Sequence, residues 1–385
     1  MTLLQSMSRK EMLGIRSVRW DDARRIGGDD VIALSVADMD FKAPSAIVDA
    51  VTERARMGDY CYTYIDDSYS QSVSSWFSRR HGWKIPTEQI VPVGRMVESM
   101  PAILRQVLKP GSKVLVPYPA YSPTPAAILA AGCQVVPWGL TLTDSGRYEY
   151  DFAAMDSLMD ACDAAVITNP HNPTGRVWTR TELARIAQAA ASRGVLVISD
   201  EFHADLIMND YEFQPYLTCD PAASAGIAFN SPGKTFNMAG LEIVNIVVPD
   251  DGLRRQVHKA IDDAGCHNPR FFAQVAAQAG YDKSEAWLDE LLDLVKGHVS
   301  MLRECMHGIK GARLIEPEGT YLNWLDLRGL GLTDGQIEER MLKAGLVLDP
   351  GTDFGPQGSG FVRICLATTT PIFREALGRL AQALR

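Results

Sequence analysis

Short apolar runs alternate with helix-patterned segments through the middle of the chain. Residues 113–117 form one such apolar run, ending in Pro117. Three further runs cover residues 164–168, 195–199 and 242–248. Between two of these runs, apolar residues recur at helical spacing over 181–190 and Gly194 follows, which predicts a helix and its end. Because alternating strands and helices form a mostly parallel sheet covered on both faces, this region is predicted to be α/β.

The last third of the chain has a different pattern. A long amphipathic helix is predicted over 286–306, where Trp287, Val295 and several leucines mark an apolar stripe. Strands at 320–327 and 360–366, a helix at 334–344 and a final helix after Pro371 are predicted to follow. We therefore expect a large α/β domain over residues 40–255 and a small α+β domain made of residues 1–39 and 256–385.

Composition narrows the class of protein. The chain has 385 residues, 46% of them hydrophobic, and a net charge of -9, which argues against general nucleic-acid binding. No apolar stretch approaches about 18 residues, so no membrane span is expected. The seven cysteines include no CxxC pair, so no metal site is expected, and their sparse, odd number suits a reducing compartment. Since the N-terminus also lacks a signal-peptide pattern, we expect a cytoplasmic protein.

Polar or glycine-rich turns follow four of the predicted strands. They begin at Gly94, Asn169, Asp200 and Asn230. Taken singly, each has an ordinary explanation as a turn, a helix cap or a solvated lysine. Their order is more specific, because Asn172, Asp200 and Lys234 are about one strand–helix–strand unit apart. In open α/β sheets such strand ends carry the ligand-binding residues, so the three side chains are expected to meet.

The order Asn-Pro-x-Asn-Pro-x-Gly, Asp-Glu and Ser-x-x-Lys resembles the signature of fold-type I pyridoxal-5'-phosphate (PLP) enzymes, the aspartate aminotransferase superfamily. Within it, the chain is most similar to the MalY/PatB cystathionine β-lyase group. The matching segments are residues 36–41, 62–64, 79–83, 169–178, 199–205, 234–241, 319–326 and 360–367. The resemblance covers about residues 31–371 and implies the PLP-dependent transferase fold, with a mostly parallel, seven-stranded sheet in the large domain.

The resemblance assigns roles around the cofactor ring. Lys234 would hold PLP as a Schiff base and, once freed, remove the substrate Cα proton. Asp200 would face the pyridine nitrogen and keep it protonated, and Asn172 would donate to the ring 3'-oxygen. Tyr121 matches the aromatic residue that stacks on the ring. His203 replaces the tyrosine that many aminotransferases have three residues after the aspartate, and an ordinary core histidine remains an equal alternative.

The cofactor phosphate requires backbone N–H groups at a helix start, with hydroxyls or cations nearby. Gly94, Arg95 and Met96 would supply the turn and Ser231 a hydroxyl. In the family, a tyrosine of the partner subunit also reaches the phosphate, and Tyr62 is the candidate here. The resemblance therefore implies a homodimer with its active site at the subunit interface.

The substrate is expected to be an amino acid. Arg363 would bind its α-carboxylate through a bidentate pair, and the apolar residues 364–367 favour a buried functional arginine over a surface one. Ala37, Tyr321 and Ser35 lie in or beside matched motifs and are assigned to the substrate side of the pocket.

Several positions depart from the family pattern. Glu242 stands eight residues after Lys234, where classical aminotransferases have a phosphate-binding arginine, which argues mildly against transamination. Arg95 and Glu98 occupy a turn that is usually small or apolar, and Ser35 replaces a common tryptophan. These changes indicate a wider or more polar pocket and a bulky cysteine conjugate or biosynthetic intermediate as substrate. Two further departures are Gly233, which removes a hydroxyl beside the lysine, and Pro101, which should confine or kink the helix after the turn.

The resemblance leaves more than one activity open. The leading hypothesis is a carbon–sulfur β-lyase that converts a cysteine S-conjugate or cystathionine-like thioether to a thiol, pyruvate and ammonia. An aminotransferase is the main alternative, since both reactions need the same Lys, Asp, Asn and Arg. Oxidative or decarboxylating deamination is less favoured. A non-catalytic regulator is disfavoured, because the lysine is retained and no helix-turn-helix segment or basic tail is evident.

Overall fold

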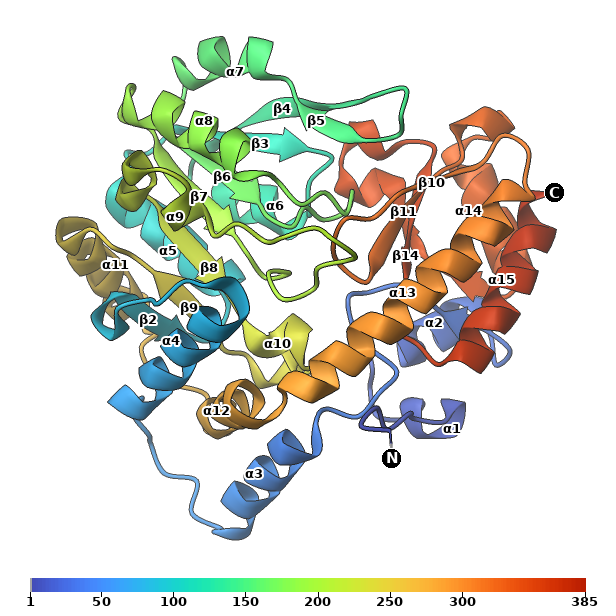
Figure 1. Ribbon diagram of the computed structural model, residues 1–385, viewed down its shortest axis with the longest axis horizontal. Helices are drawn as coiled ribbons and strands as arrows, with labels where there is room; N and C mark the ends of the chain where they lie inside the picture. Colours follow the sequence, from blue (N-terminus) through green and yellow to red (C-terminus); the bar gives the residue numbers. More distant parts are fainter. Residues whose placement is uncertain (1) are drawn as a thin grey trace.

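A computed structural model describes residues 2–385 (Figure 1). The larger sheet has eight strands in the order β2-β9-β8-β7-β6-β3-β4-β5. Their bounds are β2 (Ile90–Val93), β3 (Lys113–Tyr118), β4 (Gln134–Leu142), β5 (Tyr148–Tyr150), β6 (Ala164–Thr168), β7 (Leu196–Asp200), β8 (Ile227–Asn230) and β9 (Val244–Val247). Strands β4, β3, β6, β7 and β8 are parallel to one another, and β5, β9 and β2 pair antiparallel. The α/β prediction is confirmed, with one strand more than expected.

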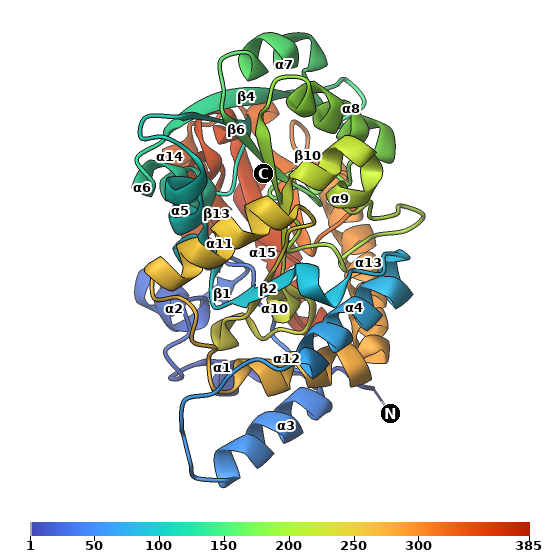
Figure 2. The ribbon, with the colours of Figure 1, turned by 90° about the vertical axis from the view of Figure 1, so that its left-hand side faces the viewer.

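Helices cover both faces of this sheet. Figure 2 shows α5 (Met96–Val107), α6 (Pro123–Ala130) and α11 (Asp251–Asp263) on one side, and α8 (Arg180–Ala191) and α9 (Tyr216–Cys219) on the other. Successive side chains of a strand point to opposite faces. Ala164 and Val166 of β6 accordingly join one apolar core, while Ala165 and Ile167 join the other. The continuous apolar runs in the sequence reflect this burial on both faces.

The smaller sheet is antiparallel, in the order β10-β11-β14-β13. Its strands are β10 (Arg313–Ile315), β11 (Leu322–Asp326), β13 (Asp349–Pro350) and β14 (Phe361–Cys365). Beside it lie α14 (Asp334–Lys343), α15 (Thr370–Leu384), and a parallel pair formed by β1 (Ile32–Ala33) and β12 (Leu346–Val347). The chain start, with α1 (Arg9–Met12) and α2 (Trp20–Gly27), thus pairs with the C-terminal part. The division at residue 255 remains a prediction.

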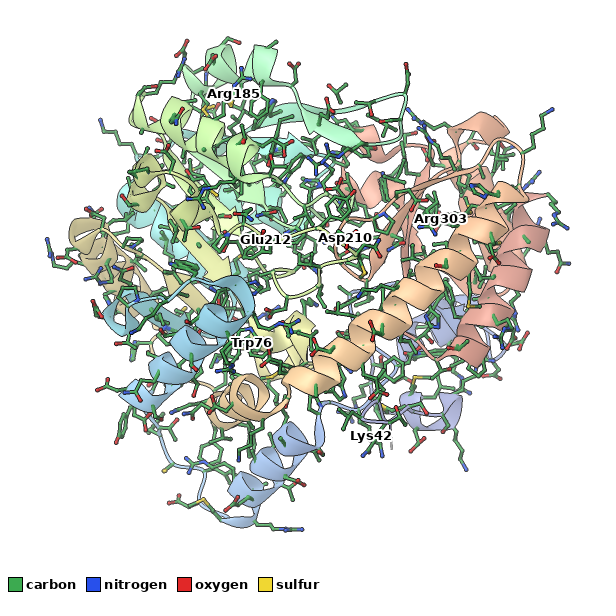
Figure 3. All side chains as sticks on the ribbon, viewed as in Figure 1. Lys42, Trp76, Arg185, Asp210, Glu212 and Arg303 are labelled. Atoms are coloured by element: carbon green, nitrogen blue, oxygen red, sulfur yellow. The ribbon has the colours of Figure 1, made fainter. Side chains whose placement is uncertain are left out.

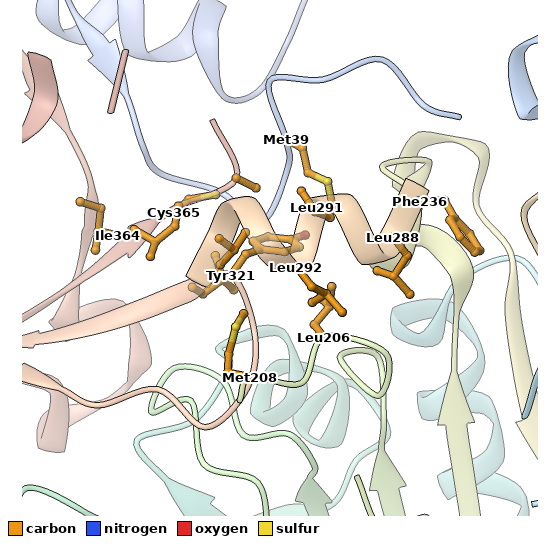
Figure 4. Close-up of a cluster of buried hydrophobic side chains, with 14 of the residues drawn as sticks. Met39, Leu206, Met208, Phe236, Leu288, Leu291, Leu292, Tyr321, Ile364 and Cys365 are labelled. Carbon is orange, nitrogen blue, oxygen red and sulfur yellow. The ribbon is translucent and has the colours of Figure 1, made fainter. Parts of the chain in front are cut away.

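The long helix α13 (Glu285–His307) occupies the predicted span and runs diagonally beside the small sheet (Figure 1). Its buried face contributes Leu288, Leu291 and Leu292 to the cluster in Figure 4, together with Tyr321 and Met39. Each large apolar side chain contributes about 1.5–3 kcal/mol when fully buried. This cluster packs the chain start, α13 and the small sheet against one another.

The remaining helices are α3 (Ser45–Arg56), α4 (Asp67–His81), α7 (Phe152–Met159), α10 (Pro232–Thr235) and α12 (Ala273–Lys283). Pro101 lies inside helix α5 without confining it, since the helix continues to Val107, and the alternative expectation of a kink stays a prediction. Within residues 2–385, no helix is both long and apolar enough to cross a membrane. The same residues contain no cluster of histidine, cysteine and acidic side chains arranged to hold a metal ion.

Candidate active site

A cavity of about 330 Å³ opens at the C-terminal ends of the parallel strands, facing the small sheet. It is bounded by Thr168, Asp200 and Ser231 at or just beyond the ends of β6, β7 and β8, and by Asp349 and Arg363 of the small sheet. The chain start closes the cavity through Val36 and Ala37. Its remaining lining residues are Gly94, Arg95, Met96, Val97, Tyr121, Asn172, Phe202, His203, Gly233, Lys234, Ala239, Glu242, Ile243 and Val244. Two sheets and the chain start therefore build one pocket.

Lys234 lies on the short helix α10, whose start is capped by the Ser231 hydroxyl accepting from the Gly233 N–H at 3.1 Å. Its Nζ donates to the Ala37 carbonyl oxygen at 2.8 Å. Burial lowers the pKa of Lys234, the Asp38 carboxylate partly opposes this, and the Arg363 charge adds to the lowering. A buried amine with a lowered pKa is suited to act as a nucleophile and as a base.

A buried carboxylate anchors helix α10. Thr235, next to Lys234, donates to Asp205 at 2.6 Å, and Trp76 of α4, labelled in Figure 3, donates to the same carboxylate at 3.0 Å. His81 completes the group at 2.7 Å. Burial alone would raise the pKa of Asp205, but hydrogen bonds and the charge of His81 hold that pKa below its usual value. Lys234 is thereby positioned by groups outside the cavity.

Asp200 is the last residue of strand β7, and its carboxylate is buried with few hydrogen bonds to offset the cost of burying a charge. Its Oδ1 accepts from the Phe202 N–H at 3.3 Å. Burial raises the pKa of Asp200 to about 7. Since a buried carboxylate is stable only when paired, this side chain is suited to a cationic N–H group placed in the cavity.

His203 also lines the cavity, with its ring 6.2 Å from that of Tyr321. Among the residues that the structure describes, its Nδ1 has no hydrogen-bond partner. Burial, with the charges of Lys234 and Arg363, lowers the pKa of His203 to about 3, so the ring is neutral. The unsatisfied buried nitrogen favours a ligand-facing role over that of a satisfied core histidine.

Arg363 is a buried residue on strand β14. Its Nε and Nη2 donate to the same oxygen of Asp349, at 2.9 and 2.7 Å, and its Nη1 donates to Asn172 at 2.9 Å. The guanidinium lies 4.7 Å from the ring centre of Phe354. Sequence reasoning missed Asp349. Asp349 is opposite Arg363 only through the antiparallel β13–β14 register, which no sequence motif marks.

The backbone of Val36 and Ala37, just before Asp38, is hydrogen-bonded to side chains of the site. The Val36 N–H donates to Asp349 at 3.1 Å, and the Ala37 carbonyl accepts from Tyr321 at 3.1 Å as well as from Lys234. Val36 has a φ of 59°, which is rare for a β-branched residue. Backbone strain of this kind persists where surrounding contacts hold it, and often at ligand sites.

The predicted phosphate turn lies at the start of α5. Gly94, Arg95 and Met96 line the cavity. Among residues 2–385 no side chain caps the helix, so its first N–H groups are available to an anion. The Ser231 hydroxyl is differently placed from the expectation. It donates its proton to the Ile243 carbonyl at 2.6 Å, so in this arrangement it has none to offer a phosphate.

Most of the predicted site residues meet in the cavity. These are Lys234, Asp200, Asn172, Tyr121, His203, Ser231, Gly94, Arg95, Met96, Arg363 and Ala37. Tyr321 and Ser35 are buried but do not line it, and Tyr321 acts through Ala37. Tyr62 is 93% exposed, in the segment between α3 and α4, which lies at an outer edge in Figures 1 and 2. The described chain therefore does not bring Tyr62 to its own cavity.

Comparison with known proteins identifies the family of this chain. The model of the family "aminotransferase class I and II" matches residues 29–383. The chain belongs to this family.

Three relatives cover nearly the whole chain. Cystathionine β-lyase PatB of Bacillus subtilis is 33% identical, over 98% of each chain. Protein MalY of Escherichia coli is 27% identical, over 97% of this chain and 96% of its own. The crystal structure of cystalysin from Treponema denticola, which contains a pyridoxal 5'-phosphate cofactor, superposes with a TM-score of 0.94 at 31% identity, over 99% of this chain and 98% of its own.

Proposed function

We propose that this protein is a PLP-dependent carbon–sulfur β-lyase. The observation that carries the proposal is the buried amine of Lys234, in one cavity with the uncompensated carboxylate of Asp200 and the guanidinium of Arg363. A protonated ring nitrogen would pair with Asp200, and the ring 3'-oxygen would accept from Asn172. The full-length similarity to PatB favours a lyase among the activities that this site supports.

PLP, when bound, supplies an electron sink for the negative charge that develops at the substrate Cα. The protein residues perform the remaining work. Arg363 binds the α-carboxylate, with Asn172 and Asp349 holding the guanidinium in place. The neutral amine of Lys234 accepts the Cα proton. The C–S bond then breaks, the sulfur leaves as a thiolate that takes up a proton, and water hydrolyses the remaining fragment to pyruvate and ammonia.

An aminotransferase remains the alternative, because the removal of the Cα proton uses the same residues. The two reactions differ in whether a keto acid is consumed. A lyase should release pyruvate and thiol in equal amounts from an S-alkyl cysteine without any keto acid. We expect this outcome in an assay that quantifies both products over many turnovers. Product that forms only after a keto acid is added would contradict the lyase.

The cavity also supports the proposal of a bulky substrate. Charged Arg95 and Glu242 line it, beside Tyr121 and Met96. Charged side chains in the lining would accommodate a larger or more polar S-substituent than a wholly apolar lining would. The expected substrates are therefore extended cysteine S-conjugates, and cleavage of cystathionine as fast as any larger conjugate would argue against this choice.

We further propose a homodimer in which Tyr62 completes the neighbouring site. Tyr62, Tyr60, Tyr64 and Met57 are exposed large hydrophobic residues in one short segment, as an interface requires. The seven free cysteines suit a cytoplasmic location.

Mixing two inactive variants tests the shared site. Lys234→Ala and Tyr62→Ala subunits should each give little activity alone. After unfolding and refolding together, they should recover up to about a quarter of wild-type activity, because a mixed dimer contains one site with neither change. The measurement is pyruvate release per subunit. No recovery, in a mixture that sedimentation shows to be dimeric, would place Tyr62 outside the partner's site.

A further inference from the structure

Four charged side chains form a closed ring at the start of α5. Arg270 lies between Glu98 and Glu242, with its Nη2 and Nε each 3.1 Å from a carboxylate oxygen. Arg95 closes the ring on the other side, 3.7 Å from Glu98 and 3.6 Å from Glu242. Arg270 therefore hydrogen-bonds to both carboxylates, whereas Arg95 lies at ion-pair distance from them.

Arg270 lies directly against the glycine of the predicted phosphate turn. A Cβ atom on residue 94 would lie 3.2 Å from Nε of Arg270 and 3.4 Å from its Nη2. Any larger side chain at this position would crowd the guanidinium. The turn and the arginine therefore fit each other, although Arg270 is 176 positions away from Gly94 in sequence.

A phosphate bound at this turn would otherwise meet unfavourable charge. Glu98 and Glu242 bring two carboxylates close to the turn. The Ser231 hydroxyl donates its proton to the Ile243 carbonyl and not to the cavity. Without Arg270, only Arg95 would balance the two glutamates, leaving one net negative charge beside a dianion. With Arg270 the ring is neutral, so the free N–H groups of the helix start can attract the phosphate.

We propose that Arg270 is the cation that supports the cofactor phosphate, in place of an arginine at position 242. The proposal rests on the PLP site described above. Glu98 and Glu242 hold the guanidinium against the turn, and the positive φ of Glu242, 57°, is the local strain that this arrangement retains. The positive charge at the turn would thus come from position 270 of the sequence and not from position 242.

The affinities of the apoenzyme for PLP and for pyridoxal, which lacks the phosphate, test this role. Arg270→Gln should weaken PLP binding about 10- to 100-fold. A charge-assisted interaction is lost, and the negative charge of Glu242 loses its nearest positive partner beside the phosphate. Pyridoxal affinity should be unchanged. Both dissociation constants can be measured by titration with the quenching of protein fluorescence, without any turnover.

Two further variants sharpen the test. Arg105→Gln changes an exposed arginine near the other end of α5 and should alter neither affinity. Glu242→Arg combined with Arg270→Gln should recover at least half of the lost preference for PLP over pyridoxal, since the cation returns from the other side of the ring.

Equal loss of PLP and pyridoxal affinity in Arg270→Gln would overturn the proposal, because it would indicate a structural role. Unchanged PLP affinity would overturn it as well. If the wild-type protein bound neither compound, the PLP assignment itself would fail. If instead the wild-type protein and Arg270→Gln bound PLP equally well, the PLP assignment would stand and only the role of Arg270 would fail.

Discussion

Lys234→Ala is expected to lower C–S cleavage by at least about 10⁴-fold, because the variant loses both the cofactor-binding amine and the Cα base. The short side chain also removes the hydrogen bond to the Ala37 carbonyl. The fold should persist, since α10 remains anchored through Thr235 and Asp205. Pyruvate release, together with the visible absorbance of the bound cofactor before and after dialysis, measures the two losses separately.

The matched control is Lys343→Ala. Lys343 is exposed on α14 and forms an ion pair with Glu339 at the surface, so its replacement should change neither activity nor absorbance. Retained activity in Lys234→Ala would remove the central residue of the proposed site. Added methylamine should restore part of the proton transfer if the lost amine acts as a base.

Asp200→Asn is expected to lower turnover by roughly 10²- to 10⁴-fold while PLP still binds. An amide has nearly the shape of the carboxylate but cannot stabilise a protonated ring nitrogen. Asp210, which Figure 3 labels, is exposed, and Asp210→Asn is the control with the same chemical change, which should leave turnover unaltered. A rate for Asp200→Asn within threefold of wild type would contradict the role given to Asp200.

The same residue makes the apoenzyme sensitive to pH. Burial raises the pKa of Asp200 in the folded protein to about 7, above its value in the unfolded chain. The folded state therefore binds more protons than the unfolded state between about pH 4 and pH 7, so stability falls as pH rises through this range. The loss for Asp200 is on the order of 4 kcal/mol.

Urea unfolding of the apoenzyme at several pH values measures this loss. Asp200→Asn should become the more stable protein above about pH 7, because its side chain does not ionise. Burial also raises the pKa of Glu201, to about 8, and the Asp200 charge adds to this rise, so Asp200→Asn should also relieve Glu201 and enlarge the difference in stability at high pH. Bound PLP should reduce the difference, since a protonated ring nitrogen would pair with the carboxylate.

Much of this site could be predicted from the sequence, because the site residues directly follow predicted strands. Asn172, Asp200 and Lys234 each come after an apolar run, and parallel strands bring their C-terminal ends to one edge. The burial of Arg363 was also predictable from the apolar residues that follow it, whereas its role came from the family resemblance. Ser231 was a candidate by motif alone, and the direction of its hydroxyl proton depends on the Ile243 carbonyl across the turn.

Other features depended on contacts between distant segments. Asp349 meets Arg363 through strand register, and Arg270 meets Gly94 through the packing of the segment before α12 against the start of α5. The lowered pKa of Lys234 and the raised pKa of Asp200 both arise from burial in the assembled pocket. None of these can be read from local composition, because burial is a property of the whole fold.

By itself, the sequence determined the α/β class, the order of the strand-end residues and the lysine that marks the family. These follow from hydrophobic periodicity and short motifs, which are local. The tertiary structure alone decided which carboxylate binds Arg363, which arginine lies at the predicted phosphate turn and how the chain start contacts Lys234. Each of these depends on side chains far apart in sequence, whose meeting is set by packing and not by spacing.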